Sequence, residues 1–501
     1  MSSVKPTFKE RVSKFLVSLH EALSTVWSYG LGKIGLILLF AVIVISIYAL
    51  ITMPPGFIAK WNSPQTWWNY PKEAPPEWTR LLGAQLAKHE IVVLKGSELS
   101  IERVGRRQYV VFETTYPLDV DGFPQRINTS ITLSRIIANK EISAKLVVVR
   151  PDDVVLTIGE SPINLSRTTA QFISSDPEKT AYSYIAVIKK YKISQTIYSR
   201  ELDNIKLMYT QAVFGVPKVV KVGEREKIVF EPLKGEYKIR ILIPVTKDLL
   251  REIQRDGVKE VVITIVGQCY GWLGTDIQGR DLALGILYGF PVALLVGFFA
   301  ATTATMIGMI AGVISGYYGG IVDESIQRLV DIMINVPLLP ILVLIGAIAQ
   351  IYIPNPWLRL FIIIGFLILF SWGGTAIIVR SMTLSIKSEP YIEAAKAVGA
   401  SDVRIIFKHI IPQVIPYVFA VLVFSVPGAI LTEAGLSILG IRHGLPTWGQ
   451  ILSDARRAVP ESMGMWWWIL PPGIMLALTS FTFVSLGMAL ETIVEPRLRR
   501  T

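Results

Sequence analysis

Long apolar runs separated by short polar loops occupy much of the chain, and one large polar block follows the first run. An apolar run of about 20 residues is long enough to cross a bilayer as a helix. The predicted spans are Ile34–Met53, Phe290–Tyr317, Ile326–Ile351, Leu360–Val379, Gln413–Leu439 and Trp466–Leu490. The first run is longer than the core of a signal peptide, so we expect a retained anchor. The pattern predicts an all-α polytopic membrane protein with six transmembrane helices.

The polar block, residues 54–281, is expected to be a β-rich α+β domain inserted between the first and second helices. Stretches such as HEIVVLKG, RQYVVFETTY, INTSITLSRI, AKLVVVR and EVVITIVG are rich in β-branched residues and bounded by Gly, Pro or Asp, which is typical of strands. AYSYIAVIKKY and TKDLLREIQRDG favour helices instead. The block is long enough to bury a core of its own.

The distribution of Lys and Arg predicts the orientation of the chain, because these residues are enriched in cytoplasmic loops. They are concentrated in the N-terminal segment 1–33, in the loop 380–416 and in the C-terminal tail 491–501. We therefore expect both termini in the cytoplasm and the block 54–281 outside it. Residues 282–490 would form a five-helix core in the plasma membrane.

The composition agrees with a membrane protein. Of 501 residues, 51% are hydrophobic and 18% are charged, and the mean hydropathy is +0.48. The formal charge of +11 is scattered over the termini, the polar block and the loops, so the sequence does not predict nucleic-acid binding. Cys269 is the single cysteine and there are four histidines. These numbers disfavour a disulfide, a metal site and a catalytic cluster, so we expect a non-catalytic chain without cofactor or metal.

The charged, alanine-rich segment Glu389–Pro416 lies between two apolar runs and predicts a helix-turn-helix. Ser388 is placed to cap a first short helix, and Gly399 stands where a left-handed residue would end it. Ser401 or Asp402 would cap a second helix, before a proline resets the chain for the next span. Such a unit would project from the membrane as a docking site. Spacing alone leaves an amphipathic loop lying on the bilayer as the alternative.

The same segment carries a family resemblance. Glu393-Ala394-Ala395, then Gly399, then Pro412 resemble the EAA loop of inner-membrane permeases in binding-protein-dependent ABC importers. EAAKAVGASDVRIIFKHIIP is similar to the dipeptide, oligopeptide and nickel branch, as are LGTDIQGRD, EAGLSILG with LPTWGQIL, and EPRLRR. The resemblance covers the first span and residues 273–500. Most members of the branch have only a short loop where this chain has its polar block.

The resemblance implies that the chain is half of a translocation path and that ATP is hydrolysed on other chains. The sequence contains no G-x-x-x-x-G-K-[ST] phosphate loop. The implied partners are a second homologous permease, two ATP-binding subunits, an extracytoplasmic substrate-binding protein and the lipid bilayer. Peptides are the expected substrate, with oligosaccharides or nickel as alternatives. The residues expected to couple the chain to the ATPases are Glu393, Ala394, Ala395, Gly399, Asp402 and Pro412.

Candidates for the translocation path or the outer gate are Asp276, Asp281, Glu433 and Ser437. Glu433 lies within an apolar run, where an acidic side chain is costly unless it faces water, a cavity or a partner. The alternative is a residue at headgroup level that merely ends the span. The two aspartates lie near glycines and could bind a cation or a substrate amine, or act only as helix caps and turn formers.

Two other classes of protein fit the sequence less well. A membrane-anchored ligand sensor would need a cytoplasmic output domain, but the longest loop expected inside is the EAA segment. A self-sufficient secondary transporter would show internal symmetry and ion ligands within the membrane, and the sequence shows neither.

Overall fold

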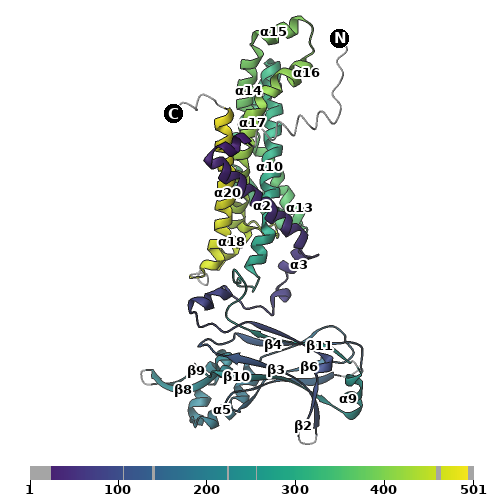
Figure 1. Cartoon of the computed structure of the whole chain (residues 1–501), viewed down its shortest axis with the longest axis vertical. Helices are drawn as coiled ribbons and strands as arrows, with labels where there is room; N and C mark the ends of the chain where they lie inside the picture. Colours follow the sequence, from purple (N-terminus) through teal and green to yellow (C-terminus); the bar gives the residue numbers. More distant parts are fainter. Residues whose placement is uncertain are drawn as a thin grey trace. The chain divides into compact units, whose positions relative to one another are not determined.

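The computed structural model describes residues 24–104, 107–137, 141–222, 225–255, 257–458 and 464–494. The chain divides into two compact units (Figure 1). The polar domain is residues 63–283, and the membrane unit combines the residues before 63 with those from 284 onward. Most of the predicted terminal segments, 1–33 and 491–501, lies outside the described residues.

The membrane unit is helical. Its elements are α2 (Gly30–Thr52), α3 (Phe57–Trp61), α10 (Leu282–Tyr318), α11 (Gly320–Asn335), α12 (Leu338–Tyr352), α13 (Pro356–Ser371), α14 (Gly373–Lys387), α15 (Pro390–Ala397), α16 (Asp402–Ile405), the π-helical turn η4 (Ile406–Ile410), α17 (Ile411–Ile438), α18 (Trp448–Arg457) and α20 (Trp466–Val494). Within the described ranges, five helical stretches are long and apolar enough to cross a membrane: α2, α10, α13 with α14, α16 through α17, and α20.

The span predicted at Ile326–Ile351 is wrong as an uninterrupted helix. The helices α11 and α12 take its place, and they are bent by 76° relative to each other. Between them lie Val336 and Pro337. Proline lacks an amide N–H and pushes the preceding residue out of the helical region. Val336 is accordingly extended, with φ −73° and ψ 127°. Counted as one crossing, the pair would raise the five described spans to six.

Two glycines one turn apart bring α10 against the backbone of α14. A Cβ added to Gly312 would lie 2.6 Å from the carbonyl oxygen of Ala376, and one on Gly316 would lie 2.8 Å from that of Arg380. Small residues at this spacing let membrane helices approach backbone to backbone. The close contact ties α10 to the helix that leads into the segment 389–416, and the sequence analysis did not single it out.

The polar domain is built mainly from antiparallel sheets. Its longer elements are β1 (Glu90–Lys95), β2 (Ser100–Val104), β3 (Arg107–Leu118), β4 (Arg126–Leu133), β5 (Glu141–Val149), β6 (Val155–Asn164), β7 (Gln171–Ser174), α4 (Pro177–Ser183), α5 (Ile185–Lys190), α6 (Gln195–Arg200), α7 (Leu202–Leu207), α8 (Tyr209–Phe214), β8 (Gly215–Val222), β9 (Arg225–Pro232), β10 (Gly235–Val245), α9 (Lys247–Gln254) and β11 (Val258–Val266). The short 3-10 turns are η1 (Pro64–Trp67), η2 (Glu77–Leu82) and η3 (Gly96–Glu98). One sheet has the order β1-β11-β4-β7, a second has β2-β3-β10-β5-β6, and β8 pairs with β9.

Alternation of side chains builds the core of the five-stranded sheet. In β10, Tyr237, Ile239, Ile241 and Ile243 are buried and share one face, as expected for a strand with a period of two. The strands predicted from HEIVVLKG, RQYVVFETTY, INTSITLSRI, AKLVVVR and EVVITIVG are confirmed as β1, β3, β4, β5 and β11, and the helices from AYSYIAVIKKY and TKDLLREIQRDG as α4 with α5 and as α9. The sequence analysis missed β10, which is the middle strand of this sheet.

The compact polar domain begins later than the predicted boundary at residue 54. The helix α3 packs within the membrane unit instead, where the rings of Phe57 and Tyr288 lie 4.4 Å apart edge to face. A Cβ on Gly285 would lie 2.4 Å from the buried Trp61 ring. Buried aromatic contacts of this kind are favourable, and they hold α3 against α10.

Candidate functional site

The segment 389–416 contains a short helix that ends at a glycine. The helix α15 has a proline in its first turn and closes with a Schellman motif. The amide of Ala400 donates to the carbonyl of Ala395 at 3.0 Å, and the amide of Gly399 donates to that of Lys396 at 2.9 Å. Gly399 has a φ of +85°, so the predicted left-handed glycine is confirmed.

Two details of the predicted segment are wrong. Ser388 does not cap α15, because its hydroxyl donates back to the carbonyl of Ser385 at 2.8 Å and Glu389 holds the N-cap position. Pro412 does not separate a second short helix from the next span, because α16, η4 and α17 follow one another as one helical stretch. A proline inside a helix cannot donate to the carbonyl four residues earlier, and the π-helical turn directly before it accommodates this loss.

The segment has one buried and one exposed face at one end of the membrane unit (Figure 1). The buried side chains are Ile392, Ile405, Ile406 and Ile410, which pack with residues of α10, α14 and α17. The exposed side chains include Glu393, Ala394, Asp402, Val403, Phe407 and Pro412, while Ala395 is half-buried. Val398 is 90% exposed. Exposed apolar side chains on a packed support mark a surface for interaction.

Tyr317, in the last turn of α10, is a contact of this segment that sequence reasoning missed. The ammonium groups of Lys387 and Lys396 lie 5.7 and 5.2 Å from the centre of its ring. These distances fit cation–π attraction. The tyrosine is the last residue of a predicted span, and no sequence signal distinguished it from the other aromatic residues of the spans.

Sequence reasoning also missed an ion pair between Asp323 of α11 and Arg380 of α14. The guanidinium Nε and Nη2 each lie 2.5 Å from a different carboxylate oxygen, which is the bidentate geometry. Ser315 of α10 donates to the same carboxylate. The three helices α10, α11 and α14 are thereby joined. Arg380 entered the sequence analysis only as a positive charge that sets orientation.

Glu433 is buried and hydrogen-bonded within the chain. Its Oε1 accepts from Ser437 Oγ at 2.9 Å, from His443 Nε2 at 2.8 Å and from Thr447 Oγ1 at 3.0 Å. The amide of Leu445 donates to His443 Nδ1 at 3.1 Å, so the proton of the imidazole is on Nε2. Three donors from within the chain therefore bind one oxygen of this carboxylate.

Gln450 connects this cluster to α18. Its Nε2 donates to Ser437 Oγ at 2.8 Å and to the carbonyl of Ile441 at 3.0 Å. A Cβ on Gly449 would lie 2.5 Å from Cα of Ala434, so α18 and α17 are in close contact. The cluster of Glu433, Ser437, His443, Thr447 and Gln450, here called the Glu433 cluster, holds α18 on α17. The two roles considered for Glu433 from the sequence, in the translocation path or at headgroup level, did not predict these contacts. A role of Glu433 in the path stays a prediction.

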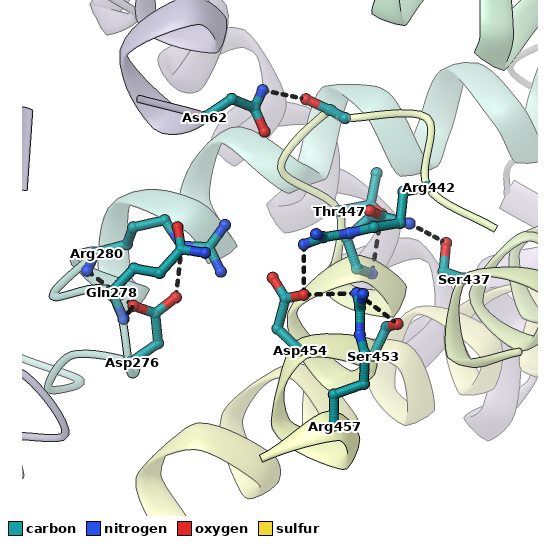
Figure 2. A network of polar contacts seen from close by, with 12 residues as sticks. Asn62, Asp276, Gln278, Arg280, Ser437, Arg442, Thr447, Ser453, Asp454 and Arg457 are labelled. Carbon is teal, nitrogen blue, oxygen red and sulfur yellow. Dashed lines mark hydrogen bonds and ion pairs between the residues drawn. The ribbon is translucent and has the colours of Figure 1, made fainter. Parts of the chain in front are cut away.

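Asp454 of α18 binds two arginines (Figure 2). Arg442 Nη2 lies 2.5 Å and Arg457 Nη2 lies 2.9 Å from its Oδ1. The carbonyl of Arg442 accepts from Arg359 of α13 at 3.3 Å. These polar contacts support the loop between α17 and α18. Sequence reasoning did not predict these contacts, because Lys and Arg were used there only to predict the orientation of the chain.

Asp276 and Asp281, both in the polar domain, accept backbone hydrogen bonds. Asp276 is buried, its Oδ1 accepts from the amides of Gln278 and Arg280 at 2.8 and 2.9 Å, and its Oδ2 lies 2.5 Å from Arg280 Nε (Figure 2). Asp281 Oδ1 accepts from the amide of Ala283 at 2.9 Å, in the first turn of α10. These contacts are those of a turn former and a helix cap, the second of the two roles considered for these aspartates from the sequence. Their role in the translocation path stays a prediction.

Cys269 is buried in the polar domain, with its Sγ 3.7 Å from the carbonyl oxygen of Ala87. Burial raises the pKa of this thiol to about 11. The cysteine is therefore a neutral packing group at ordinary pH. Among the residues that the structure describes, no three His, Cys, Asp or Glu side chains are grouped as ligands for a metal ion.

Comparison with known proteins decides the family. Residues 304–500 match the family described as "Binding-protein-dependent transport system inner membrane component". The chain is 33% identical over 231 residues to the dipeptide transport system permease protein DppC of Bacillus subtilis, a match that spans 46% of this chain and 69% of the relative. The chain belongs to this family. The resemblance drawn from the EAA motif is confirmed, and the chain is a permease of the binding-protein-dependent ABC importers in the dipeptide and oligopeptide branch.

Further relatives are also named as permeases of transport systems. This permease is 37% identical over 230 residues to the oligopeptide transport system permease protein OppC of Haemophilus influenzae, covering 46% of this chain and 71% of the relative. It is 31% identical over 230 residues to the glutathione transport system permease protein GsiD of Pectobacterium atrosepticum, covering 46% and 73%. The family and the apolar helices together make this chain a multi-pass protein of the cell membrane.

Proposed function

We propose that this permease forms half of the translocation path of an ATP-driven importer for peptides. Its partners would be a second homologous permease, two ATP-binding subunits and an extracytoplasmic substrate-binding protein. The single observation that carries the proposal is the segment 389–416, in which a left-handed glycine and buried isoleucines present exposed side chains at one end of the membrane unit. Relatives named as peptide permeases supply the substrate class.

Coupling would act through the residues of the EAA motif. Glu393, Ala394 and Ala395 would contact the ATP-binding subunit, because two of them are exposed and the third is half-buried on α15. Gly399 would hold the angle between α15 and α16. The buried isoleucines of the segment pack on α10, α14 and α17, so a movement imposed on α15 and α16 would carry these helices with it. Closure of the ATPases would thus rock the whole permease as a rigid body.

The orientation and the number of spans belong to the same proposal. Both termini and the segment 389–416 would be cytoplasmic, the polar domain would be extracytoplasmic, and the pair α11 and α12 would provide the sixth crossing. The chain would be non-catalytic, with ATP hydrolysis on its partners. The polar domain would receive the binding protein or cover the entrance of the path.

Residues predicted for the path would act by shaping its outer end. The Glu433 cluster would fix α18 on α17, so Glu433 and Ser437 would set the position of an outer gate. Asp276 and Asp281 would set the conformation of the chain that enters α10. These residues would support the gate and would not contact the substrate directly.

Reconstitution tests the proposal. The permease would be purified with its partners and inserted into proteoliposomes, and ATP-dependent uptake of a labelled peptide would be measured with and without binding protein. Uptake that needs ATP and both permeases is expected. Uptake of an oligosaccharide or of nickel, without uptake of peptide, would show that peptides are the wrong substrate class. A chain that purifies without any ATPase and transports alone would contradict the assignment as an importer subunit.

A further inference from the structure

An open hollow lies entirely within the polar domain, where η2 meets the loop after β11. Its volume is about 670 Å³, which falls in the range of sites for small ligands. The lining residues include Glu77, Trp78, Arg80, Leu81, Gln85 and Trp272. The structure thus has an aromatic and aliphatic surface and charged groups around one cavity. None of these residues entered the predicted path or coupling sites.

Arg80 carries a guanidinium whose hydrogen-bonding capacity is not used up. Its Nε is buried and has no hydrogen-bond partner in the structure. Its Nη2 lies 3.8 Å from Asp119 Oδ1, which is too far for a hydrogen bond, and the Asp119 side chain is 76% exposed. A buried donor without an acceptor is costly. The Arg80 side chain is nevertheless 24% exposed, so a carboxylate arriving in the hollow could form a charge-assisted hydrogen bond with the exposed part of the guanidinium.

Apolar surface for a ligand comes from the two tryptophans and from Leu81. The indole N–H of Trp78 donates to the carbonyl of Trp272 at 2.9 Å, so one ring holds the loop that carries the other. Trp272 itself is 80% exposed and Leu81 is 88% exposed. Large apolar side chains exposed beside a cavity are typical of binding sites. Gly271, with φ +57°, makes the turn that places Trp272 at the rim.

We propose that this hollow binds the C-terminal end of a peptide, with the terminal carboxylate on Arg80 and an apolar side chain against Trp272. The inference rests on the proposed function as a peptide importer, and it gives the polar domain a substrate site of its own. Glu77 and Gln85 line the same hollow and would accept hydrogen bonds from the peptide amides. A neutral oligosaccharide could stack on Trp272 but would bring no carboxylate to hydrogen-bond with the Arg80 guanidinium, whose distance of 3.8 Å from Asp119 is too long for a hydrogen bond.

The test uses the full-length permease in nanodiscs, without ATPases, and the peptide Leu-Leu-Leu with either a free C-terminal carboxylate or a C-terminal amide. Binding is measured by calorimetry. We expect the amide to bind about tenfold more weakly than the acid, as is usual when a charge-assisted hydrogen bond is lost. Arg80→Gln should weaken binding of the acid by a similar factor and abolish its advantage over the amide. Trp272→Ala should weaken the binding of both the acid and the amide peptide.

Matched variants elsewhere in the polar domain serve as controls. Arg167→Gln and Leu207→Ala change exposed residues outside the hollow and should leave binding unchanged. Equal affinity for acid and amide in the unaltered chain, or unchanged binding in Arg80→Gln, would overturn the proposal. So would binding of a neutral oligosaccharide in preference to the peptide. If no peptide binds but Trp272→Ala weakens binding of the substrate-binding protein, the hollow is a protein docking site instead.

Uptake by the reconstituted complex separates this inference from the proposed function. A complex that imports peptides while Arg80→Gln affects neither binding nor uptake would refute the site and leave the importer intact. A complex that imports no peptide would refute the proposed function, whereas acid-selective binding that depends on Arg80 would still be measured on the permease alone.

Discussion

The phenol of Tyr317, in the last turn of α10, donates a hydrogen bond of 2.6 Å to the carboxylate of Asp402, the first residue of α16. One partner belongs to a helix long enough to span the membrane and the other to the segment proposed to contact the ATPase. This contact therefore links the two parts that would move together in the proposed coupling.

Replacing Tyr317 by Phe removes that hydrogen bond and keeps the ring. We expect a loss of about 1 kcal/mol in stability, seen as a lower Tm of the purified permease, because a hydrogen bond to a charged group is lost at a partly exposed site. Less peptide should be transported per ATP hydrolysed. Tyr318→Phe is the matched control, since it removes a phenol hydroxyl from the next residue in the chain, which is half-exposed. Equal effects of the two variants would show that the contact with Asp402 has no role in coupling.

Substitutions at Gly399 test the turn between α15 and α16. Among the residues that the structure describes, no atom lies within 4 Å of a Cβ built at this glycine, so the cost of a side chain follows from the φ of +85°. Gly399→Val should cost about 1 kcal/mol or more and should strongly reduce transport. Gly399→Asn should be milder, because asparagine tolerates the left-handed region. Uptake and the amount of ATPase retained on purification are the measurements, and full transport by the valine variant would favour a loop that rests on the bilayer.

Two glutamates in different surroundings should respond differently to truncation. Glu433→Ala leaves the donors of Ser437, His443 and Thr447 without their acceptor, and we expect a loss of about 3 kcal/mol. Glu393→Ala removes an exposed side chain, so stability should stay within about 0.5 kcal/mol while transport falls modestly. Thermal unfolding and uptake separate the two effects. A stable Glu433→Ala permease would contradict the role given to the Glu433 cluster.

The polar domain should fold when it is expressed alone. Residues 63–283 contain an extensive buried core within one compact unit. A fragment with these bounds should be soluble and should melt cooperatively. A fragment that ends at residue 266 should have a lower Tm, because it lacks two hydrogen-bond acceptors. The amide of Glu77 donates to the carbonyl of Gly271, and the amide of Ala74 donates to Thr275 Oγ1. Circular dichroism during heating gives the comparison, and a longer fragment that stays unfolded would refute the domain assignment.

Acid should destabilise the same fragment through His89. Burial lowers the pKa of this imidazole from 6.5 to about 4. The folded state therefore disfavours the protonated ring, and the stabilising contribution is complete above pH 6.5 and lost as the pH falls toward 4. We expect a loss of about 2 kcal/mol over this range. The difference between the wild type and His89→Phe cancels the titration of carboxylates. A difference that does not change with pH would contradict the predicted shift.

Sequence reasoning performed best where one local pattern decides the structure. The left-handed Gly399 could be foreseen because a glycine followed an alanine-rich, proline-led stretch, and a helix end needs only local hydrogen bonds. Strands with runs of β-branched residues were also predicted correctly, because such a run is a local pattern. The break before Pro337 also had a local signal, and it was missed because the apolar run was counted by composition alone.

The sequence by itself determined that this chain has several apolar helices long enough to cross a membrane, a separate β-rich domain and a segment that resembles the EAA loop, because length, periodicity and motif spacing are properties of neighbouring residues. Only the tertiary structure decided the partners of the charged residues. Arg380 meets Asp323 and Glu433 meets His443, while the buried Nε of Arg80 has no acceptor among the described parts of the chain. Such contacts join residues that are far apart in the chain or lie on different helices, and a side chain's burial and hydrogen bonds depend on the packing of all the elements around it.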